Sequence, residues 1–250
     1  MDSEQYWGNA SHGEYPVGFT SCPINLSWTA PDVLDDMGQT QPAQTTVIEY
    51  GGGYQYPDLF ARQKDNREEI QRNFARKVSA NMQRSGAKVF GFICMDVDSK
   101  EAIEAYEIYA EEIGDLTGMF AVQYAPYHGG GGEIHWVENK EGIEIPVVTA
   151  RYSLWKDLGT DRGGNVRKIA NVINEDVEKE ENAMDWTVVH AWSNFKNPDN
   201  PEETASGLDP VKWTLKRLDV DIHVVSPEEL LWRIRMANDE KQTKKVISDY

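Results

Sequence analysis

The stretch Val47–Phe60, VIEYGGGYQYPDLF, joins two kinds of structure. Its first half continues from Thr45 and is β-branched and apolar, which predicts a buried strand over 45–50. Three glycines, two tyrosines and a proline follow, and this composition predicts a loop. Glu49 stands where the strand gives way to the loop. Because parallel α/β folds bind ligands at the carboxyl ends of their strands, we expect Glu49 at the active end of the fold.

Strand signals recur along the chain and alternate with amphipathic helices. The expected strands are 15–22, 45–50, 88–95, 118–125, 145–151, 186–192 and 220–225. The expected helices are 31–37, one through Ile70 and Met82 that ends at Gly86, one from a capping box at Asp98 and Glu101 to Gly114, 166–177, one that begins at Asp209-Pro210 and one that begins at Ser226. This alternation predicts right-handed βαβ units and a parallel sheet.

A seven-stranded sheet of this kind can be an open doubly wound sheet or a closed, irregular (β/α) barrel. We favour the barrel, because the long loops follow the second, fourth and sixth strands and so fall on one end, as the active face of a barrel requires. No linker-like stretch divides the chain. We therefore expect a single domain over 1–250, with 1–14 and 239–250 at its periphery.

Composition limits the classes of partner. The net charge of −17 disfavours nucleic acid and anionic membrane surfaces, because phosphate groups would be repelled. No apolar run approaches the ~18 residues that span a bilayer, and two cysteines, Cys22 and Cys94, imply free thiols rather than a disulfide framework. The N-terminus lacks the pattern of a signal peptide. The location is therefore unknown: cytoplasmic as the chain stands, or secreted if the chain comes from a longer precursor.

Acidic, imidazole and aromatic side chains gather at the expected strand ends. The expected catalytic residues are Glu49, Asp96 and His190. Hydrolysis of a glycosidic bond needs a carboxylic acid that protonates the leaving oxygen and a second carboxylate as nucleophile or base. Glu49 and Asp96 end consecutive strands, so their carboxyl groups can form such a pair. The expected substrate-binding residues are Trp28, Tyr54, Tyr56, Tyr127, His128, Glu133, Arg151 and Trp192.

Several of these residues also have a structural interpretation. Glu49 can form a salt bridge with Arg151 or Arg62, and His190 can be a hydrogen-bonded core histidine. Asp98 fits a helix N-cap better than a catalytic role. His223, inside the last expected strand, fits a structural role.

The tract HGGGGEIH, residues 128–135, contains four consecutive glycines. Such a run lets the backbone take positive φ or approach a ligand closely, and it is also typical of a mobile hairpin tip. His128, Glu133 and His135 can ligate a metal, although their spacing matches no strong zinc template. We expect no cofactor, with a divalent metal as the alternative.

Four ordered segments, GEYPVGFTSCP, GGGYQYP, YAPYHGGGGEIHWVENKEGIEIPVVTAR and VVHAW, resemble the GxGYxYP family of putative glycoside hydrolases. Gly51, Gly53, Tyr54, Tyr56 and Pro57 match every fixed position of the motif, and the resemblance runs from about Tyr15 to Leu231. It implies a C-terminal catalytic-type domain of the glycoside hydrolase/deacetylase barrel kind, typical of bacterial polysaccharide degradation. It also implies an N-terminal companion domain that this chain lacks.

Residues and resemblance together predict a glycoside hydrolase that acts on a poly- or oligosaccharide. Two alternatives stay open. One is a metal-dependent carbohydrate deacetylase that uses Asp96, His128, His135 or His190. The other is a non-catalytic glycan-binding module.

Overall fold

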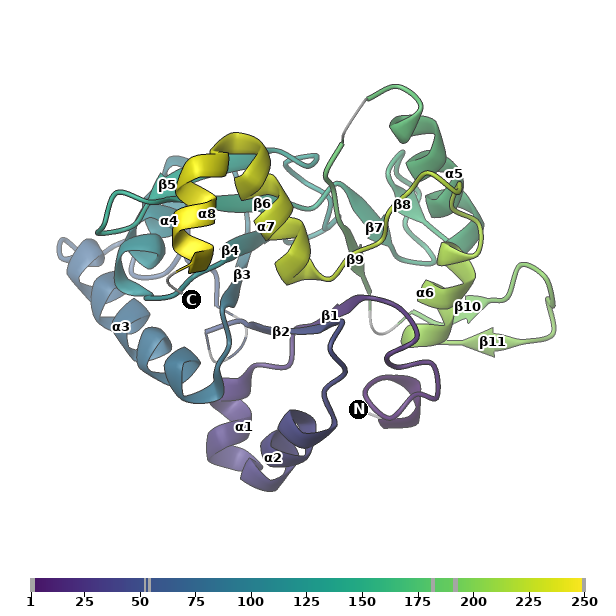
Figure 1. Ribbon diagram of the computed structural model, residues 1–250, viewed down its shortest axis with the longest axis horizontal. Coiled ribbons are helices and arrows are strands. Elements are labelled where there is room, and N and C mark those ends of the chain that lie inside the picture. Colours follow the sequence, from purple (N-terminus) through teal and green to yellow (C-terminus); the bar gives the residue numbers. More distant parts are fainter. Residues whose placement is uncertain (1–2, 52, 54, 181–182, 191–192, 249–250) are drawn as a thin grey trace.

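The computed structural model describes residues 3–51, 53, 55–180, 183–190 and 193–248, and it is an α/β protein with two halves (Figure 1). The larger half contains a six-stranded sheet in the order β1-β2-β3-β4-β6-β5. Its strands are β1 (Val17–Phe19), β2 (Thr45–Glu49), β3 (Val89–Cys94), β4 (Gly118–Gln123), β5 (Ile134–Glu138) and β6 (Glu144–Thr149). All neighbours pair in parallel except β5, which is antiparallel to β6.

Helices cover both faces of this sheet. The central strands have side chains that alternate between the faces, as the pleat requires. Phe90 packs with the helices α3 (Arg67–Ser85) and α4 (Lys100–Glu112). Its neighbour Val89 points to the other face, where α7 (Pro227–Asn238) contributes Leu231. The sheet is therefore the middle layer of three, which explains why its strands are apolar on both sides.

Two glycines let other groups approach the sheet closely. A Cβ atom at Gly118 would lie 2.7 Å from Cδ2 of the buried Leu231, so α7 packs on β4 only where no side chain intervenes. A Cβ atom at Gly91 would lie 2.4 Å from the ring of Tyr50, so that ring lies directly on β3. Both contacts depend on the missing side chain and not on an unusual backbone conformation.

The smaller half contains a parallel three-stranded sheet in the order β8-β7-β9. Its strands are β7 (Tyr152–Leu154), β8 (Gly163–Gly164) and β9 (Thr187–Val189). The helices α5 (Val166–Val177) and α6 (Leu208–Leu215) pack beside it around Leu154 and Trp213. Because β7 begins three residues after β6 ends, one extended segment, 144–154, passes from the larger sheet into the smaller one.

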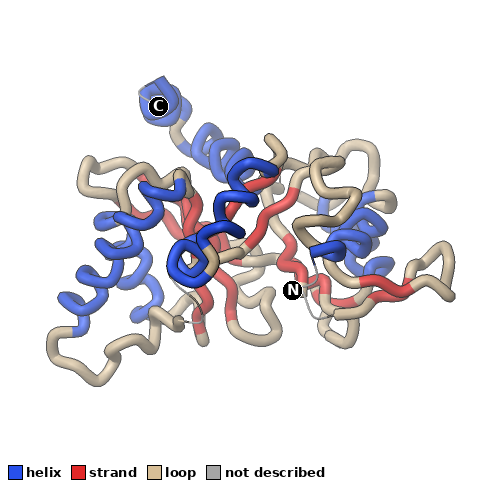
Figure 2. The backbone as a smooth tube through the Cα atoms, turned by 90° about the horizontal axis from the view of Figure 1, so that it is seen from below, coloured by secondary structure: helices blue, strands red, loops and turns tan. Residues whose placement is uncertain are grey.

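The remaining elements are short or peripheral. They are η1 (Ser3–Gln5), α1 (Pro23–Thr29), α2 (Pro31–Thr40), the antiparallel pair β10 (Phe195–Lys196) and β11 (Thr204–Ala205), and α8 (Glu240–Ser248). Seen from below, the C-terminal helix projects from the edge of the larger half (Figure 2). In the described part of the chain, no helix has the length and apolar character to cross a membrane.

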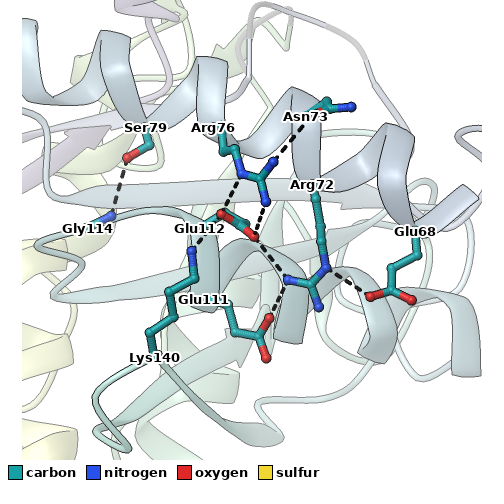
Figure 3. A network of polar contacts seen from close by, with 9 residues as sticks. All are labelled: Glu68, Arg72, Asn73, Arg76, Ser79, Glu111, Glu112, Gly114 and Lys140. Atoms are coloured by element: carbon teal, nitrogen blue, oxygen red, sulfur yellow. Dashed lines mark hydrogen bonds and ion pairs between the residues drawn. The ribbon is translucent and has the colours of Figure 1, made fainter.

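A network of ion pairs joins the outer helices of the larger half (Figure 3). The Glu112 carboxylate, whose side chain is only 3% exposed, accepts hydrogen bonds from Arg72 and Arg76 of α3 and from Lys140 in the β5–β6 turn. Arg72 also contacts Glu111 of α4. One buried carboxylate thus ties three separate elements together, and the three cations lower the pKa of Glu112 to about 2.

The α/β class and the parallel strands predicted from the sequence are confirmed, whereas ring closure is not found. The described strands pair into sheets of six, three and two, and these pairings form no closed ring. The helix α7 packs on the face of the large sheet opposite to α3 and α4. Among the described residues, the larger half is a mostly parallel sheet with helices on both sides.

The first five predicted strands correspond to β1, β2, β3, β4 and β6, and the sixth is shortened to β9. The seventh prediction, a strand over 220–225, is wrong. Val220 is 94% exposed and His223 is exposed, and the segment pairs with none of the described strands. Its β-branched residues cross the surface toward α7, and only Val225 packs against the core.

Three further predictions need correction. Residues 134–138 were expected within a loop but form β5, because they extend along β6 as an antiparallel edge strand. The N-cap of α4 is Ser99, whose Oγ accepts a hydrogen bond from the Ala102 amide, and not Asp98. The helix expected from Asp209 begins one residue earlier, at Leu208.

Candidate functional site

The motif loop after β2 is fixed to α3. The Pro57 carbonyl accepts hydrogen bonds from Gln71 (2.8 Å) and from Arg67 (3.0 Å). Gly51 has a φ of +68°, a conformation that favours glycine and turns the chain sharply after the strand. The described part of the loop is therefore anchored to α3 at Pro57.

Asp58 follows the motif and is buried, with 4% of its surface exposed. One oxygen, Oδ2, accepts hydrogen bonds from the backbone amides of Met95 (2.8 Å) and Asp96 (3.2 Å), directly after β3. The other oxygen, Oδ1, is buried and has no hydrogen-bond partner among the described residues. Asp58 was not among the residues expected from the sequence. The signal was there, since this acid directly follows the motif proline.

Asp96 lies in solvent at the end of β3. Its Oδ1 accepts a hydrogen bond from the Asp98 amide (3.1 Å), and its carbonyl accepts one from the Ser99 hydroxyl. These contacts shape the turn into α4. The structure thus brings an exposed carboxylate, Asp96, and a buried one, Asp58, to the end of the same strand.

A row of aromatic rings begins beside these two acids. The five rings, which we call the ring row, are Tyr56, Tyr124, Tyr127, Trp155 and His190. Successive ring centroids are 5.7, 5.8, 5.4 and 4.3 Å apart, and the last pair is stacked. The rings come from the loops after β2, β4, β7 and β9, so the carboxyl ends of strands in both sheets supply one continuous surface.

One ring of the row, that of Tyr124, is exposed, and the backbone of this residue is joined to β3. Tyr124 is 41% exposed, and its amide donates a hydrogen bond to the Cys94 carbonyl (2.7 Å) at the end of β3. Tyr127 has a φ of +72°, which is unusual for a residue with a side chain and is typical of functional sites. The row thus has an exposed ring, that of Tyr124, whose backbone is joined to the end of β3.

The model of the family described as "GxGYxYP putative glycoside hydrolase C-terminal domain" matches residues 1–235. The chain belongs to the GxGYxYP family. The resemblance found in the sequence is therefore confirmed. The family description names the reaction class of glycoside hydrolases. Comparison with curated proteins and with solved structures found no match.

The second tyrosine of the GxGYxYP motif, Tyr56, belongs to the ring row, and the motif proline is the anchor on α3. The first motif tyrosine, Tyr54, lies outside the described residues, as does Trp192. Trp28, also expected to bind substrate, is 78% exposed on α1. Among the ring contacts of the described residues, none joins Trp28 to the ring row, so the structure does not bring it together with the other aromatic candidates there.

Glu49 is fully buried at the end of β2, and both of its oxygens contact backbone amides. Oε2 accepts a hydrogen bond from Ile24 (2.9 Å) in the first turn of α1, and Oε1 accepts one from Tyr50 (2.8 Å). Neither salt bridge considered for it, with Arg151 or Arg62, is among the ion pairs of the described residues. Glu49 therefore joins α1 to the sheet.

The strand register separates Glu49 from Asp96. β2 and β3 are neighbours, as expected, but Glu49 pairs with Phe90. β3 continues to Cys94, four residues further, which at ~3.3 Å per residue is about 13 Å along the strand. The two acids therefore lie at different levels of the sheet, and the structure does not bring them together as a pair.

His190 ends the ring row and has its ring stacked on Trp155. Its Nδ1 lies 3.1 Å from the Ser193 hydroxyl, which also accepts a hydrogen bond from the Lys156 amide. Burial lowers the pKa of His190, so the neutral imidazole is the main form at pH 7. A neutral ring can accept a proton or a hydrogen bond from a hydroxyl group.

His128 and Arg151 make structural contacts. The Nε2 atom of His128 lies 2.7 Å from the Thr160 hydroxyl, and burial lowers the pKa of this histidine. Arg151 is buried between β6 and β7. Its guanidinium forms ion pairs with Asp176, Glu180 and Asp185. These three acids leave Arg151 little capacity to bind a substrate.

The glycine tract packs against the strand ends. Gly130 has a φ of +84°, and a Cβ atom there would lie 2.6 Å from the Thr149 side chain. The Thr149 amide and hydroxyl both donate hydrogen bonds to the Glu133 carbonyl, just before β5 begins. The close-approach interpretation of this tract therefore fits better than that of a loose hairpin tip.

Glu133 and His135 meet a residue that the sequence analysis assigned to helix capping. Their ligand atoms and those of Asp98 all lie within 4.8 Å of one another. The Nε2 atom of His135 is 3.1 Å from Asp98 Oδ1. His128, which was grouped with them in the sequence, instead contacts Thr160. Two carboxylates and one imidazole thus form the metal-ligand geometry found among the described residues.

Proposed function

We propose that the protein hydrolyses a glycosidic bond in a poly- or oligosaccharide that lies along the ring row. The observation that carries the proposal is the row itself, in which five contiguous rings from four loops lie at the carboxyl ends of the strands, where Asp96 is also exposed. Aromatic faces are electron-rich and attract the C–H surface of a sugar ring. Family membership supports the same reaction class.

Asp96 is our candidate for the carboxyl group that contacts the substrate, with Asp58 as its buried neighbour. Asp58 Oδ2 is 3.2 Å from the Asp96 amide nitrogen, so the two side chains share one strand end. One carboxyl is solvated and the other is buried, and such contrasting surroundings allow two carboxyls to divide acid and base roles. Glu49, initially expected to pair with Asp96, is in this proposal a positioning residue.

His190 acts at the other end of the row. As a neutral imidazole stacked on Trp155, it can accept a hydrogen bond from a sugar hydroxyl. The proposal therefore assigns binding to Tyr56, Tyr127 and Trp155 and acid–base chemistry to the Asp96 end.

The test is the release of reducing ends from a panel of polysaccharides. Asp96→Asn should lower turnover at least about 100-fold, as removal of an acid–base group does, while binding of the same glycan persists. Trp155→Ala should weaken binding. Asp221→Asn, which changes an exposed acid between α6 and α7, is the matched control and should leave turnover unchanged. Full turnover by Asp96→Asn would exclude the proposed role.

The Asp98, Glu133 and His135 cluster favours a second candidate, metal-assisted deacetylation of a carbohydrate. Acetate released from an acetylated polysaccharide, lost with a chelator and restored by a divalent ion, would favour this reaction over glycoside hydrolysis. Glycan binding that depends on Trp155 but yields neither product would instead identify a non-catalytic binding module.

A further inference from the structure

We propose that Asp98, Glu133 and His135 bind one divalent transition-metal ion, of which Zn²⁺ is the best probe. The three residues come from the turn after β3 and from the start of β5, and their ligand atoms lie within 4.8 Å of one another. This inference does not rest on the proposed hydrolysis, because metal binding is measured without substrate.

The distances suit a metal site that is nearly assembled. Zinc bonds to imidazole nitrogen and carboxylate oxygen are about 2.0–2.2 Å, so ligand atoms in a tetrahedral site lie about 3.4 Å apart. His135 Nε2 and Asp98 Oδ1 are already 3.1 Å apart. Glu133 is partly free to adjust, because it is exposed. A small side-chain movement therefore completes a three-ligand set.

The histidine is held in position without a metal. Its side chain is only 16% exposed, and its ring packs against that of Tyr106 in α4, with 5.8 Å between the centroids. In the sheet, His135 pairs with Val147. Because the ring cannot rotate freely, its Nε2 atom stays directed at Asp98, which lowers the entropy lost when a metal binds.

Charge supplies a second, independent reason. Within the described residues, Asp98 forms an ion pair only with His135, and Glu133 forms none. Elsewhere, lysine and arginine side chains pair with the buried acids Glu112 and Asp176. Two neighbouring carboxylates without a lysine or arginine partner repel each other, and a dication between them would remove that repulsion.

The ligand types decide the class of metal. Imidazole nitrogen suits zinc and other transition metals, whereas Ca²⁺ takes oxygen ligands, so His135 would not serve it. Asp98 is 49% exposed, so solvent can reach the site and fill the remaining coordination position. Three protein ligands and one open position are the pattern of a catalytic rather than a structural zinc site.

Isothermal titration calorimetry of the chelator-treated protein tests the proposal. Zn²⁺ should bind with a stoichiometry of one, and Co²⁺ should give visible absorption bands of a low-symmetry site. Glu133→Gln and His135→Ala should each weaken Zn²⁺ binding at least about 100-fold. Even changes to residues that only support the ligands weaken metal binding by up to about 100-fold, so loss of a ligand itself should cost at least as much. Ca²⁺ should show no saturable binding.

Matched controls separate this site from general surface binding. Glu138→Gln changes an exposed acid on the same strand, and His223→Ala removes an exposed histidine in another segment; both should bind Zn²⁺ as the unmodified protein does. Circular dichroism checks that His135→Ala is folded. Glu133→Gln tests the same site at an exposed residue, whose substitution does not disturb the packing of the core. The absence of stoichiometric Zn²⁺ binding, or unchanged affinity in both ligand variants, would overturn the proposal. Equally tight Ca²⁺ binding would overturn the assigned class of metal.

Discussion

Acidic side chains at two places in this molecule have opposite surroundings. On the outer face of α3 and α4, the buried Glu112 contacts Arg72, Arg76 and Lys140. At the carboxyl ends of the strands, Asp98 and Glu133 have no lysine or arginine partner in the described part of the chain. In a protein with a net charge of −17, cations are scarce. The difference indicates that Glu112 stabilises the fold, whereas Asp98 and Glu133 remain available to ligands.

The largest effect on stability is expected at Arg151, whose ion pairs with Asp176, Glu180 and Asp185 form a second cluster besides that of Glu112. Arg151→Met should lower the free energy of unfolding by about 3 kcal/mol, because it leaves the half-buried Asp185 without its arginine partner, whereas the buried Asp176 keeps Arg162. Urea unfolding measures this loss. Arg233→Met, which removes an exposed pair within α7, is the control and should change stability by less than about 0.5 kcal/mol. Normal stability with weaker glycan binding would instead restore Arg151 as a substrate-binding residue.

Glu112→Gln should destabilise the protein by about 2 kcal/mol, measured in the same way. The carboxylate is buried, but Arg76 and Lys140 reach solvent, which reduces the cost of leaving them unpaired. Glu240→Gln, in an exposed pair with Lys244, should have little effect. If Glu112→Gln were as stable as the control Glu240→Gln, the ion pairs of Glu112 would not hold α3, α4 and the β5–β6 turn together.

Acid should remove the contribution of Glu112. Its pKa in the folded protein is lowered from 4.5 to about 2, mainly by the hydrogen bond from Arg76. The stabilisation is therefore complete above the unfolded pKa and is lost as the pH falls through the folded one. The stability difference between the unmodified protein and Glu112→Gln should shrink from about pH 5 to about pH 2. A difference that stays constant over this range would mean that the charge of Glu112 is not what stabilises the fold.

The smallest effect is expected at the strand ends. In chelator-treated protein, Asp98→Asn and Glu133→Gln should each leave stability unchanged or raise it by up to about 0.5 kcal/mol, because each removes repulsion between neighbouring carboxylates. Thermal unfolding without metal measures this. A loss of stability comparable with that of Glu112→Gln would show that Asp98 and Glu133 also stabilise the fold. The two groups of acids would then not differ in role.

The sequence predicts the parallel core well, because buried strands carry a strong signal. β3 is apolar along its whole length, since helices cover both of its faces. The segment 220–225 has a similar β-branched pattern but lies beside none of the described strands, and composition cannot reveal whether a neighbour exists. β5 was missed for the opposite reason, because the glycine tract before it indicates a loop.

For the candidate site, the sequence predicts which end of the fold matters but not the register. Tyr56, Tyr127 and His190 were expected near one another, and the ring row joins them. The offset between Glu49 and Asp96 depends on how β2 and β3 are aligned, which no local pattern encodes. Trp155 was missed because the strand was expected to end at Arg151, whereas the chain continues as β7.

The segment 144–154 belongs to both sheets, and the ring row crosses the same boundary between Tyr127 and Trp155. A saccharide that lies along the ring row, as proposed, would therefore contact both halves of the molecule at once. Separating the halves near residues 150–151 would then cost the sugar one of its ring contacts, so sugar binding and resistance to such a separation would be thermodynamically linked.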